Sequence, residues 1–271
     1  MDISVIIATY NQPKWFKLAL LGYACQEDRD FEIVVADDGS DHRTTDVITQ
    51  IRETYALPIN HIWHEHRGFR KCTILNKATL AAKGDYLIYT DGDCIPRSDF
   101  LGWHRTLARK GHFLSGGYIP LPLNMSHAIT GNDIINKRIN SIFWLLKHGL
   151  PFNKRILRLI QNKRIGKLLN FITPSKATWN LCNVSTFKEY VLRVNGFDET
   201  LASGGQDREF GERLKNSGIH GVQIRYAAIT FHLEHNRPYR TKESIQKIKN
   251  RRKEVIREKI TTTTQGINLH L

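Results

Sequence analysis

The chain has 271 residues, 41% of them hydrophobic, which is enough for the core of one large α/β domain or two small ones. No apolar run reaches the roughly 20 residues of a membrane-spanning helix, and we expect no secretory signal because the N-terminus lacks a basic segment. The four cysteines show no CxxC spacing, which argues against a disulfide framework or zinc knuckle and favours a cytoplasmic protein. The formal net charge of +14 indicates a polyanionic partner: nucleic acid, an anionic membrane or a phosphorylated substrate.

Strand and helix signals alternate along the first hundred residues. Short apolar runs at residues 4–8, 31–36, 59–63 and 86–89 predict buried strands, and an amphipathic stretch at 14–25 predicts a helix. Because strands that alternate with helices form crossover units, we expect an α/β fold with a mostly parallel central sheet flanked by helices. Such sheets bind ligands at the carboxyl ends of their strands. The acidic turns found at those ends therefore mark the expected site.

The composition changes after Pro122. Residues 134–188 contain no Asp or Glu, and Lys and Arg are interleaved there with Ile, Leu, Phe and Trp, which predicts a basic amphipathic helical region. Beyond it we expect a helix at 207–216, a strand at 222–231 and a highly charged helix at 241–259.

The sharpest chemical signal is the DGD tripeptide at residues 91–93. Asp91 and Asp93 lie two residues apart, directly after a buried strand, where their carboxylates can share one hard divalent cation. Such a cation bridges a diphosphate and neutralises the charge that develops as the diphosphate leaves. The alternative for the tripeptide alone is an ordinary Asp-Gly turn with a solvated second Asp.

A second acidic turn, DDGS at residues 37–40, follows the second strand. A carboxylate there can accept from a nucleotide base or a ribose hydroxyl, and the glycine permits a tight turn. The turn also predicts a helix N-cap, either Ser40 or Asp41. Tyr10, after the first strand, lies at the same edge, where it can stack on a base or serve as an ordinary rim aromatic.

Together these segments resemble the family 2 glycosyltransferases of the GT-A fold, in order and in spacing. The NGFDE turn at 195–199 and the GGQDREF segment at 204–210 are similar to the acceptor half of the galactosyltransferase and chondroitin-polymerase type. The resemblance implies a metal-dependent, inverting transferase of the hexosyltransferase type. Such an enzyme moves a sugar from a UDP-sugar to an acceptor hydroxyl.

The resemblance implies a site for Mn²⁺ or Mg²⁺. In the family a DxD pair binds the ion and the donor phosphates, which maps to Asp91 and Asp93, with Gly92 between them in the donor site. A late histidine completes the metal site in related enzymes, and His232 matches that position better than His235. A histidine at the end of a strand is also commonly structural.

The resemblance also implies contacts to the nucleotide sugar. The second Asp of the DDGS motif contacts the uracil, which maps to Asp38, and Thr9 and Tyr10 frame the base. Asn183 matches a residue that lines the sugar pocket, although Trp179 stands in an altered context beside it.

The catalytic base of the family maps to Asp207, at the start of a predicted helix. A single displacement needs a base that takes the proton of the acceptor hydroxyl, and Asp207 is suited to this role. The alternative is a carboxylate that only compensates the helix dipole. Gln206 stands where the family usually has Glu, which puts some contacts to the acceptor in doubt.

Three basic residues follow the third strand: Arg67, Arg70 and Lys71. We expect Arg70 to reach the donor diphosphate or base, and exposed solubilising charge is the alternative.

We divide the chain into four segments. Residues 1–125 are the nucleotide-sugar-binding half, and 126–175 are a basic helical insertion. Residues 176–236 are the acceptor and catalytic-base half of the same GT-A domain, and 237–271 are a basic C-terminal helical tail.

The positive charge of the insertion suits an anionic membrane surface, or its apolar face packs on the catalytic domain. We therefore expect a cytoplasmic protein, peripheral on the inner face of the cell membrane. Its acceptor would be a saccharide or lipid-linked saccharide in the synthesis of bacterial surface polysaccharide or lipopolysaccharide. A nucleic-acid-binding protein is disfavoured because no recognition motif is present and acidic turns repel nucleic acid. A sugar nucleotidyltransferase is disfavoured because no Gly-rich basic loop follows the first strand.

Overall fold

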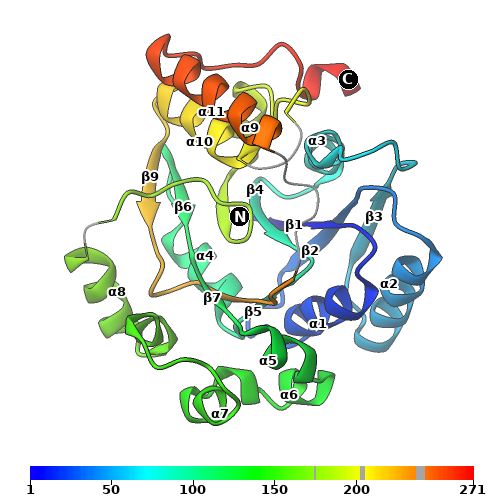
Figure 1. Ribbon diagram of the computed structural model, residues 1–271, viewed down its shortest axis with the longest axis vertical. Coiled ribbons are helices and arrows are strands. Elements are labelled where there is room, and N and C mark those ends of the chain that lie inside the picture. Colours follow the sequence, from blue (N-terminus) through cyan, green and yellow to red (C-terminus); the bar gives the residue numbers. More distant parts are fainter. Residues whose placement is uncertain (174, 202–204, 236–241) are drawn as a thin grey trace.

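A seven-stranded sheet forms the centre of the computed structural model, which describes residues 1–173, 175–201, 205–235 and 242–271 (Figure 1). Its order is β3-β2-β1-β4-β8-β6-β9. All neighbouring strands run parallel except β8, which is antiparallel to β4 and β6. The strands are β1 (Ile3–Thr9), β2 (Phe31–Asp37), β3 (Ile59–Trp63), β4 (Tyr86–Asp91), β6 (His112–Ser115), β8 (Val184–Phe187) and β9 (His220–Gln223). The predicted α/β class with a mostly parallel sheet is confirmed.

A three-stranded sheet in the order β5-β10-β7 adjoins the end of β4. It consists of β5 (Cys94–Pro96), β7 (Gly117–Pro120) and β10 (Ile229–His232). β10 is antiparallel to β5, and their register sets His232 opposite Cys94. A residue late in the chain thereby lies beside the turn that follows β4.

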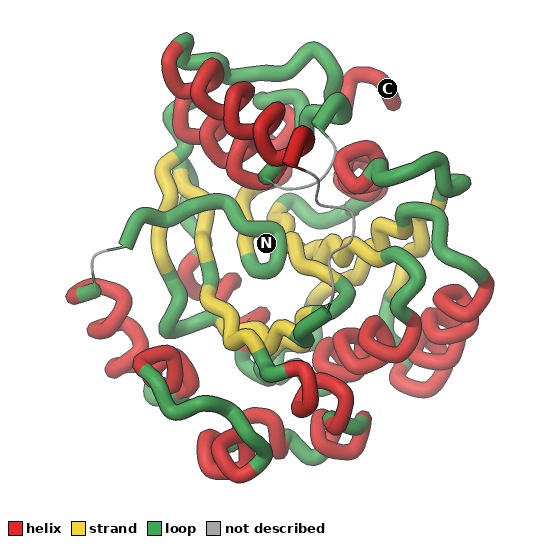
Figure 2. Tube along the Cα trace, in the orientation of Figure 1, coloured by secondary structure: helices red, strands yellow, loops and turns green. Residues whose placement is uncertain are grey.

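The helices of the first half flank the central sheet (Figure 2). α1 spans Pro13–Ala24, α2 His42–Tyr55, α3 Lys71–Ala81 and α4 Phe100–Leu107. α1 begins with proline, whose fixed φ suits the first turn of a helix. Of the two predicted caps of α2, Asp41 is the N-cap, because its carboxylate accepts from the amide of Arg43. All seven residues of β1 are buried, as expected for a strand covered on both faces.

The strand predicted at 222–231 is wrong, because β9 and β10 are separate strands in different sheets. Residues 224–228 form a turn in which the amides of Ala227 and Ala228 both donate to the carbonyl of Ile224. The apolar residues across this turn, Ile224 and Tyr226 to Ala228, are buried without belonging to one strand.

The basic insertion consists of short helices. They are α5 (Leu123–Ala128), α6 (Gly131–Ile135), η1 (Arg138–Asn140), α7 (Ile142–Lys147), η2 (Lys154–Leu159) and α8 (Lys163–Ile172). Gly149, at a φ of 100°, follows α7 and helps the chain to turn before η2. In the part of the chain that is described, no helix has the length and apolar character needed to span a membrane.

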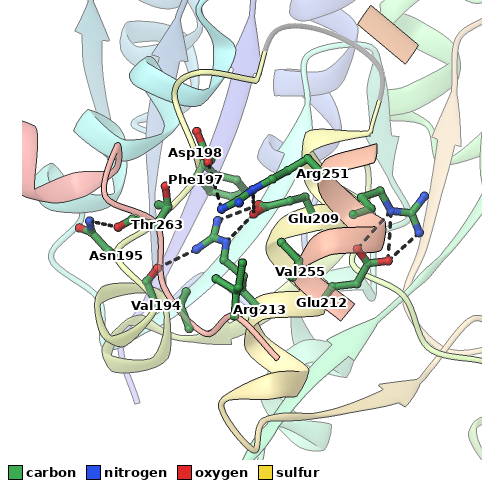
Figure 3. A network of polar contacts seen from close by, with 12 residues as sticks. Val194, Asn195, Phe197, Asp198, Glu209, Glu212, Arg213, Arg251, Val255 and Thr263 are labelled. Carbon is green, nitrogen blue, oxygen red and sulfur yellow. Dashed lines mark hydrogen bonds and ion pairs between the residues drawn. The ribbon is translucent and has the colours of Figure 1, made fainter. Parts of the chain in front are cut away.

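The C-terminal helix α11 (Lys242–Arg257) packs along α10 (Gln206–Asn216), and Figure 3 shows the polar contacts between them. Short helix α9 (Lys188–Arg193) and η3 (Ile267–His270) complete this end of the molecule. At its centre the fully buried guanidinium of Arg213 donates to both carboxylate oxygens of Glu209, at 2.8 and 3.0 Å. The same guanidinium donates to the carbonyls of Val194 and Gly196. Arg213 thus fixes α10 to the chain segment before it.

We expect Arg213→Ala to lower the free energy of unfolding by about 3–5 kcal/mol, because it leaves the Glu209 carboxylate buried without its bidentate partner. Urea denaturation measures this. Arg257→Ala removes an exposed pair with Glu258 instead and should change the stability by less than about 1 kcal/mol. Equal losses from the two variants would contradict the role given to Arg213.

Candidate active site

A cavity of about 530 Å³ opens where β1, β2 and β4 end. It is lined from both halves of the chain, as expected for a parallel sheet that binds a ligand at its carboxyl edge. Its polar and aromatic lining includes Thr9, Tyr10, Asp38, His66, Lys71, Asp91, Asp93, Tyr118, Asn180, Gln206, Asp207, His232 and His235. Gly92 also lines it. Eight of the ten predicted site residues therefore lie at one cavity, and Arg70 and Asn183 do not.

Asp38 lies at one end of the cavity, where two hydrogen bonds hold its carboxylate in place. Its Oδ1 accepts from Nε2 of His64 at 2.7 Å, and its Oδ2 accepts from the amide of Arg70 at 2.9 Å. Burial lowers the pKa of His64, and the hydrogen bond to Asp38 opposes that change. Tyr10 stacks on His66 with ring centroids 4.5 Å apart. Because that spacing leaves no room between the rings, a base would stack on the outer face of the pair.

The DGD turn is held against the end of β1. The amide of Gly92 donates to the carbonyl of Ala8 at 2.8 Å, and a Cβ on Gly92 would lie 3.1 Å from atoms of Phe16 and Thr9. A side chain at this position would crowd the turn, which explains the glycine. Asp91 ion-pairs with Lys71 at 2.5 Å.

Asp93 faces two histidines. Its Oδ2 lies 2.8 Å from Nε2 of His235 and 3.6 Å from Nε2 of His232. Burial raises the pKa of Asp93, but the hydrogen bond with His235 and the charge of His232 outweigh it, so that the pKa falls to about 2. Asp93 is therefore a carboxylate at neutral pH.

These donors fit a divalent cation. Ligand atoms of Asp93, Cys94 and His232 lie within 4.8 Å of one another. Carboxylate oxygen and imidazole nitrogen suit manganese and, for the oxygens, magnesium. Burial raises the pKa of Cys94 well above its ordinary value, which favours the neutral thiol. His235, the second choice of the sequence analysis, is closer to Asp93 than His232 is.

Asp207 lies in the first turn of α10, on the same cavity. Its Oδ1 accepts from the amide of Arg208 at 2.8 Å. Burial raises the pKa of Asp207, and the nearby Asp91 raises it further, while Arg208 and Lys71 act against the rise. A carboxylate with a raised pKa is a stronger base, as proton abstraction requires. Gly204, the first residue of the GGQDREF segment, lies outside the described residues.

The structure directs Arg70 away from the predicted contact. Its guanidinium donates to the carbonyl of Glu65, and its backbone amide supports Asp38. Lys71, the neighbour that the sequence analysis ranked lower, lines the cavity instead. The reason is that α3 begins at Lys71, so Arg70 precedes the helix.

Asn183 is the second correction. Its side chain is buried; the amide nitrogen donates to the carbonyls of Gly117 and Ala228, and the amide oxygen accepts from His104. These contacts use both amide hydrogens to join β7 to the turn before β10. Asn180, three residues earlier, lines the cavity. No motif marked Asn180 or Tyr118, because their place depends on contacts between distant segments.

The chain is similar in sequence to known glycosyltransferases. Residues 4–113 match the model of "Glycosyl transferase family 2". The chain is 25% identical to chondroitin synthase from Escherichia coli over 256 residues, which cover 86% of this chain and 34% of that enzyme. The chain thus spans about a third of that relative's length.

Two solved structures share the fold. Staphylococcus aureus TarS 1–349, in complex with UDP-GlcNAc, superposes with a TM-score of 0.62 and 16% identity, over 99% of this chain and 69% of TarS 1–349. GalNAc-T7 with UDP, GalNAc and Mn²⁺ superposes with a TM-score of 0.62 and 15% identity, over 94% of this chain and 48% of GalNAc-T7. The chain thus resembles glycosyl transferase family 2 over residues 4–113 and chondroitin synthase over most of its length, and it shares the GT-A fold of these two solved structures.

Proposed function

We propose that this protein is a metal-dependent, inverting glycosyltransferase that moves a sugar from a UDP-sugar to an acceptor hydroxyl. One observation carries the proposal: Asp207 and the DGD turn at residues 91–93 line the same cavity. A single displacement needs a base on the acceptor side and charge stabilisation on the leaving-group side. Both kinds of group meet at this cavity.

Asp38 and Tyr10 are the proposed contacts to the uracil. Both oxygens of Asp38 already accept one hydrogen bond each, and a carboxylate oxygen has a second lone pair for the N–H of a base. Thr9 lies beside them at the end of β1 and is mostly buried. The fixed carboxylate would read the base edge, while the Tyr10–His66 pair offers an aromatic surface.

Asp91, Asp93 and His232 are the residues proposed to hold Mn²⁺ or Mg²⁺, with His235 beside them. When bound, such an ion neutralises the negative charge of the departing diphosphate. Lys71 contributes a further positive charge next to Asp91.

Asp207 is the proposed catalytic base. As the acceptor oxygen attacks the anomeric carbon, its proton passes to the Asp207 carboxylate, and the bond from that carbon to the UDP oxygen breaks. Attack from the side opposite to the leaving group inverts the configuration of the anomeric carbon.

The acceptor is proposed to be a saccharide or lipid-linked saccharide in the synthesis of bacterial surface polysaccharide or lipopolysaccharide. The site of action is proposed to be the cytoplasm, at the inner face of the cell membrane. The support is chemical: four carboxylates line the cavity of a chain whose net charge is +14, so the excess positive charge lies elsewhere on the molecule. Nucleic acid is not a proposed partner, because the acidic cavity would repel it.

Asp93→Ala should abolish transfer and remove the Mn²⁺ dependence of UDP binding, because the ion loses a carboxylate ligand. Calorimetric titration with UDP, with and without Mn²⁺, and UDP release from UDP-sugars measure the two effects. Asp46→Ala, on an exposed position of α2, is the control and should change neither. Full transfer by wild-type protein in excess chelator would refute the metal dependence.

Asp207→Asn should lower kcat by about 10²–10⁴-fold, because the proton acceptor is lost while the side-chain shape is kept. UDP affinity should stay within about twofold of wild type. A variant that loses UDP binding but keeps its kcat would make Asp207 a donor-site residue.

The pH profile gives a further test of the base. Because Asp207 must be deprotonated to act and its pKa is raised, wild-type kcat should fall with decreasing pH at a pH above the ordinary titration range of aspartate. This acid limb should be absent from the residual activity of Asp207→Asn. An unchanged limb in that variant would assign it to another group.

A further inference from the structure

Three phenylalanines of the basic insertion are almost fully exposed. Phe143 is 86% exposed, and Phe152 and Phe171 are each 87% exposed. They belong to three successive parts of the insertion: α7, the segment before η2, and α8. Single exposed apolar side chains are ordinary, but several large ones in one region mark a surface that meets a partner.

Helix α8 turns its apolar face away from the protein. It contacts the body through Gly166, whose Cβ would lie 2.8 Å from the carbonyl of Tyr226, and through Asn170, whose Oδ1 accepts from the amide of Tyr226. Ile165 and Leu168 lie on the other side of the helix and are 42% and 56% exposed. An amphipathic helix normally buries its apolar face. Because α8 exposes this face to solvent, contact with apolar surroundings outside the protein would stabilise it.

The charged residues of this segment of the sequence have one sign, although Glu234 from outside it lies beside Pro151, Asn153 and Arg155. No Asp or Glu occurs from residue 134 to 188, and Lys154, Arg164 and Lys167 are exposed. Arg158 differs, because its guanidinium donates to the carbonyl of Tyr118 and burial lowers its pKa. The exposed cations lie close along the chain to the exposed apolar residues of η2 and α8 and are accessible to an anionic partner.

We propose that this docking face, formed by the exposed side chains of α7, of the segment before η2, of η2 and of α8, binds the surface of an anionic lipid bilayer. A bilayer accepts both kinds of group, because phenylalanines enter the acyl boundary while Lys and Arg contact the headgroups. Nucleic acid would use the cations but leave Ile165 and Leu168 in water. In Figure 1, α7 lies at the lower rim of the molecule and α8 at its left rim, both away from α10 and α11 at the top.

The docking face connects to the catalytic cavity through η2. Arg158 of η2 bonds to the carbonyl of Tyr118 in β7, and the side chain of Tyr118 lines the cavity. A protein that rests on the bilayer by this face would therefore bind through a segment that contacts the wall of the cavity. A lipid-linked acceptor would then meet Asp207 near the membrane. This last step alone rests on the proposed function.

The first test separates apolar insertion from charge. Purified protein is floated with vesicles of phosphatidylcholine alone or mixed with phosphatidylglycerol. We expect binding to the mixed vesicles only, and the triple variant Phe143→Ser, Phe152→Ser, Phe171→Ser should weaken it by roughly tenfold or more. The control variant Leu192→Ser, Ile256→Ser, Leu269→Ser changes exposed apolar residues outside the insertion and should bind as wild type.

The second test concerns charge. Lys154→Gln, Arg164→Gln, Lys167→Gln should weaken binding to the mixed vesicles by roughly a hundredfold, and added salt should weaken wild-type binding, because exposed charges are screened over about 8 Å. Lys249→Gln, Lys253→Gln, Lys259→Gln neutralises the same number of exposed charges in and after α11 and should have little effect. The proposal is overturned if wild-type protein ignores the mixed vesicles. It is also overturned if only the α11 variant releases the protein, or if the phenylalanine variant binds unchanged.

Vesicle binding and UDP release are independent readouts. Both insertion variants should keep wild-type UDP release with a soluble acceptor, because none of the changed residues lines the catalytic cavity. A protein that binds vesicles but releases no UDP from any UDP-sugar would refute the proposed function and leave the docking face intact. Loss of soluble-acceptor turnover in the phenylalanine variant, with vesicle binding retained, would assign the surface to the acceptor and overturn the docking proposal.

Discussion

The end of β1 is the point on which the site depends. The carbonyl of Thr9 accepts from the amide of Asp38, and the carbonyl of Ala8 accepts from the amide of Gly92. Both acidic turns are therefore fastened to the last two residues of one fully buried strand. A strand covered on both faces has little freedom to shift, since every residue packs against neighbours. The distance between base recognition and phosphate binding is thus set by the backbone.

The cavity is lined by carboxylates although the protein as a whole is basic, and charge balance with a ligand explains the difference. Asp38, Asp91, Asp93 and Asp207 line it together with Lys71. A nucleoside diphosphate sugar brings further negative charge into this space, and binding would be opposed without a compensating cation. The same carboxylates that oppose a bare diphosphate are the groups that a divalent ion requires. Charge balance in the cavity thus favours the donor and the ion entering together.

Much of the site was predictable because strand ends are a local property of the sequence. Apolar runs followed by acidic turns predicted that Asp38, Asp91 and Asp93 lie at one edge of the sheet, and all three line the cavity there. The choice between Arg70 and Lys71 was not predictable. Successive side chains of a helix point about 100° apart around its axis, so a shift of one residue in the start of α3 decides which side chain faces the cavity. The start of α3 is set by packing on β2 and β1, which the local sequence does not reveal.

The structural role of Asn183 also could not be predicted from the sequence. Its role comes from three acceptor or donor groups on β7, α4 and the turn before β10, which lie 45 to 79 residues away along the chain. The late strand was misjudged for the same reason, because the break between β9 and β10 is defined by pairing with β6 and β5. Contacts between distant segments decide such cases.

The position of the basic insertion has an evolutionary consequence. It leaves the fold after β7 and returns before β8, and the central sheet is complete without any of its helices. Its sequence can therefore diverge, or be exchanged for another, without moving a strand that carries the DGD turn or the helix that carries Asp207. The proposed membrane-binding face and the proposed catalytic residues therefore belong to separate stretches of the chain, so selection can alter one while the other stays constant.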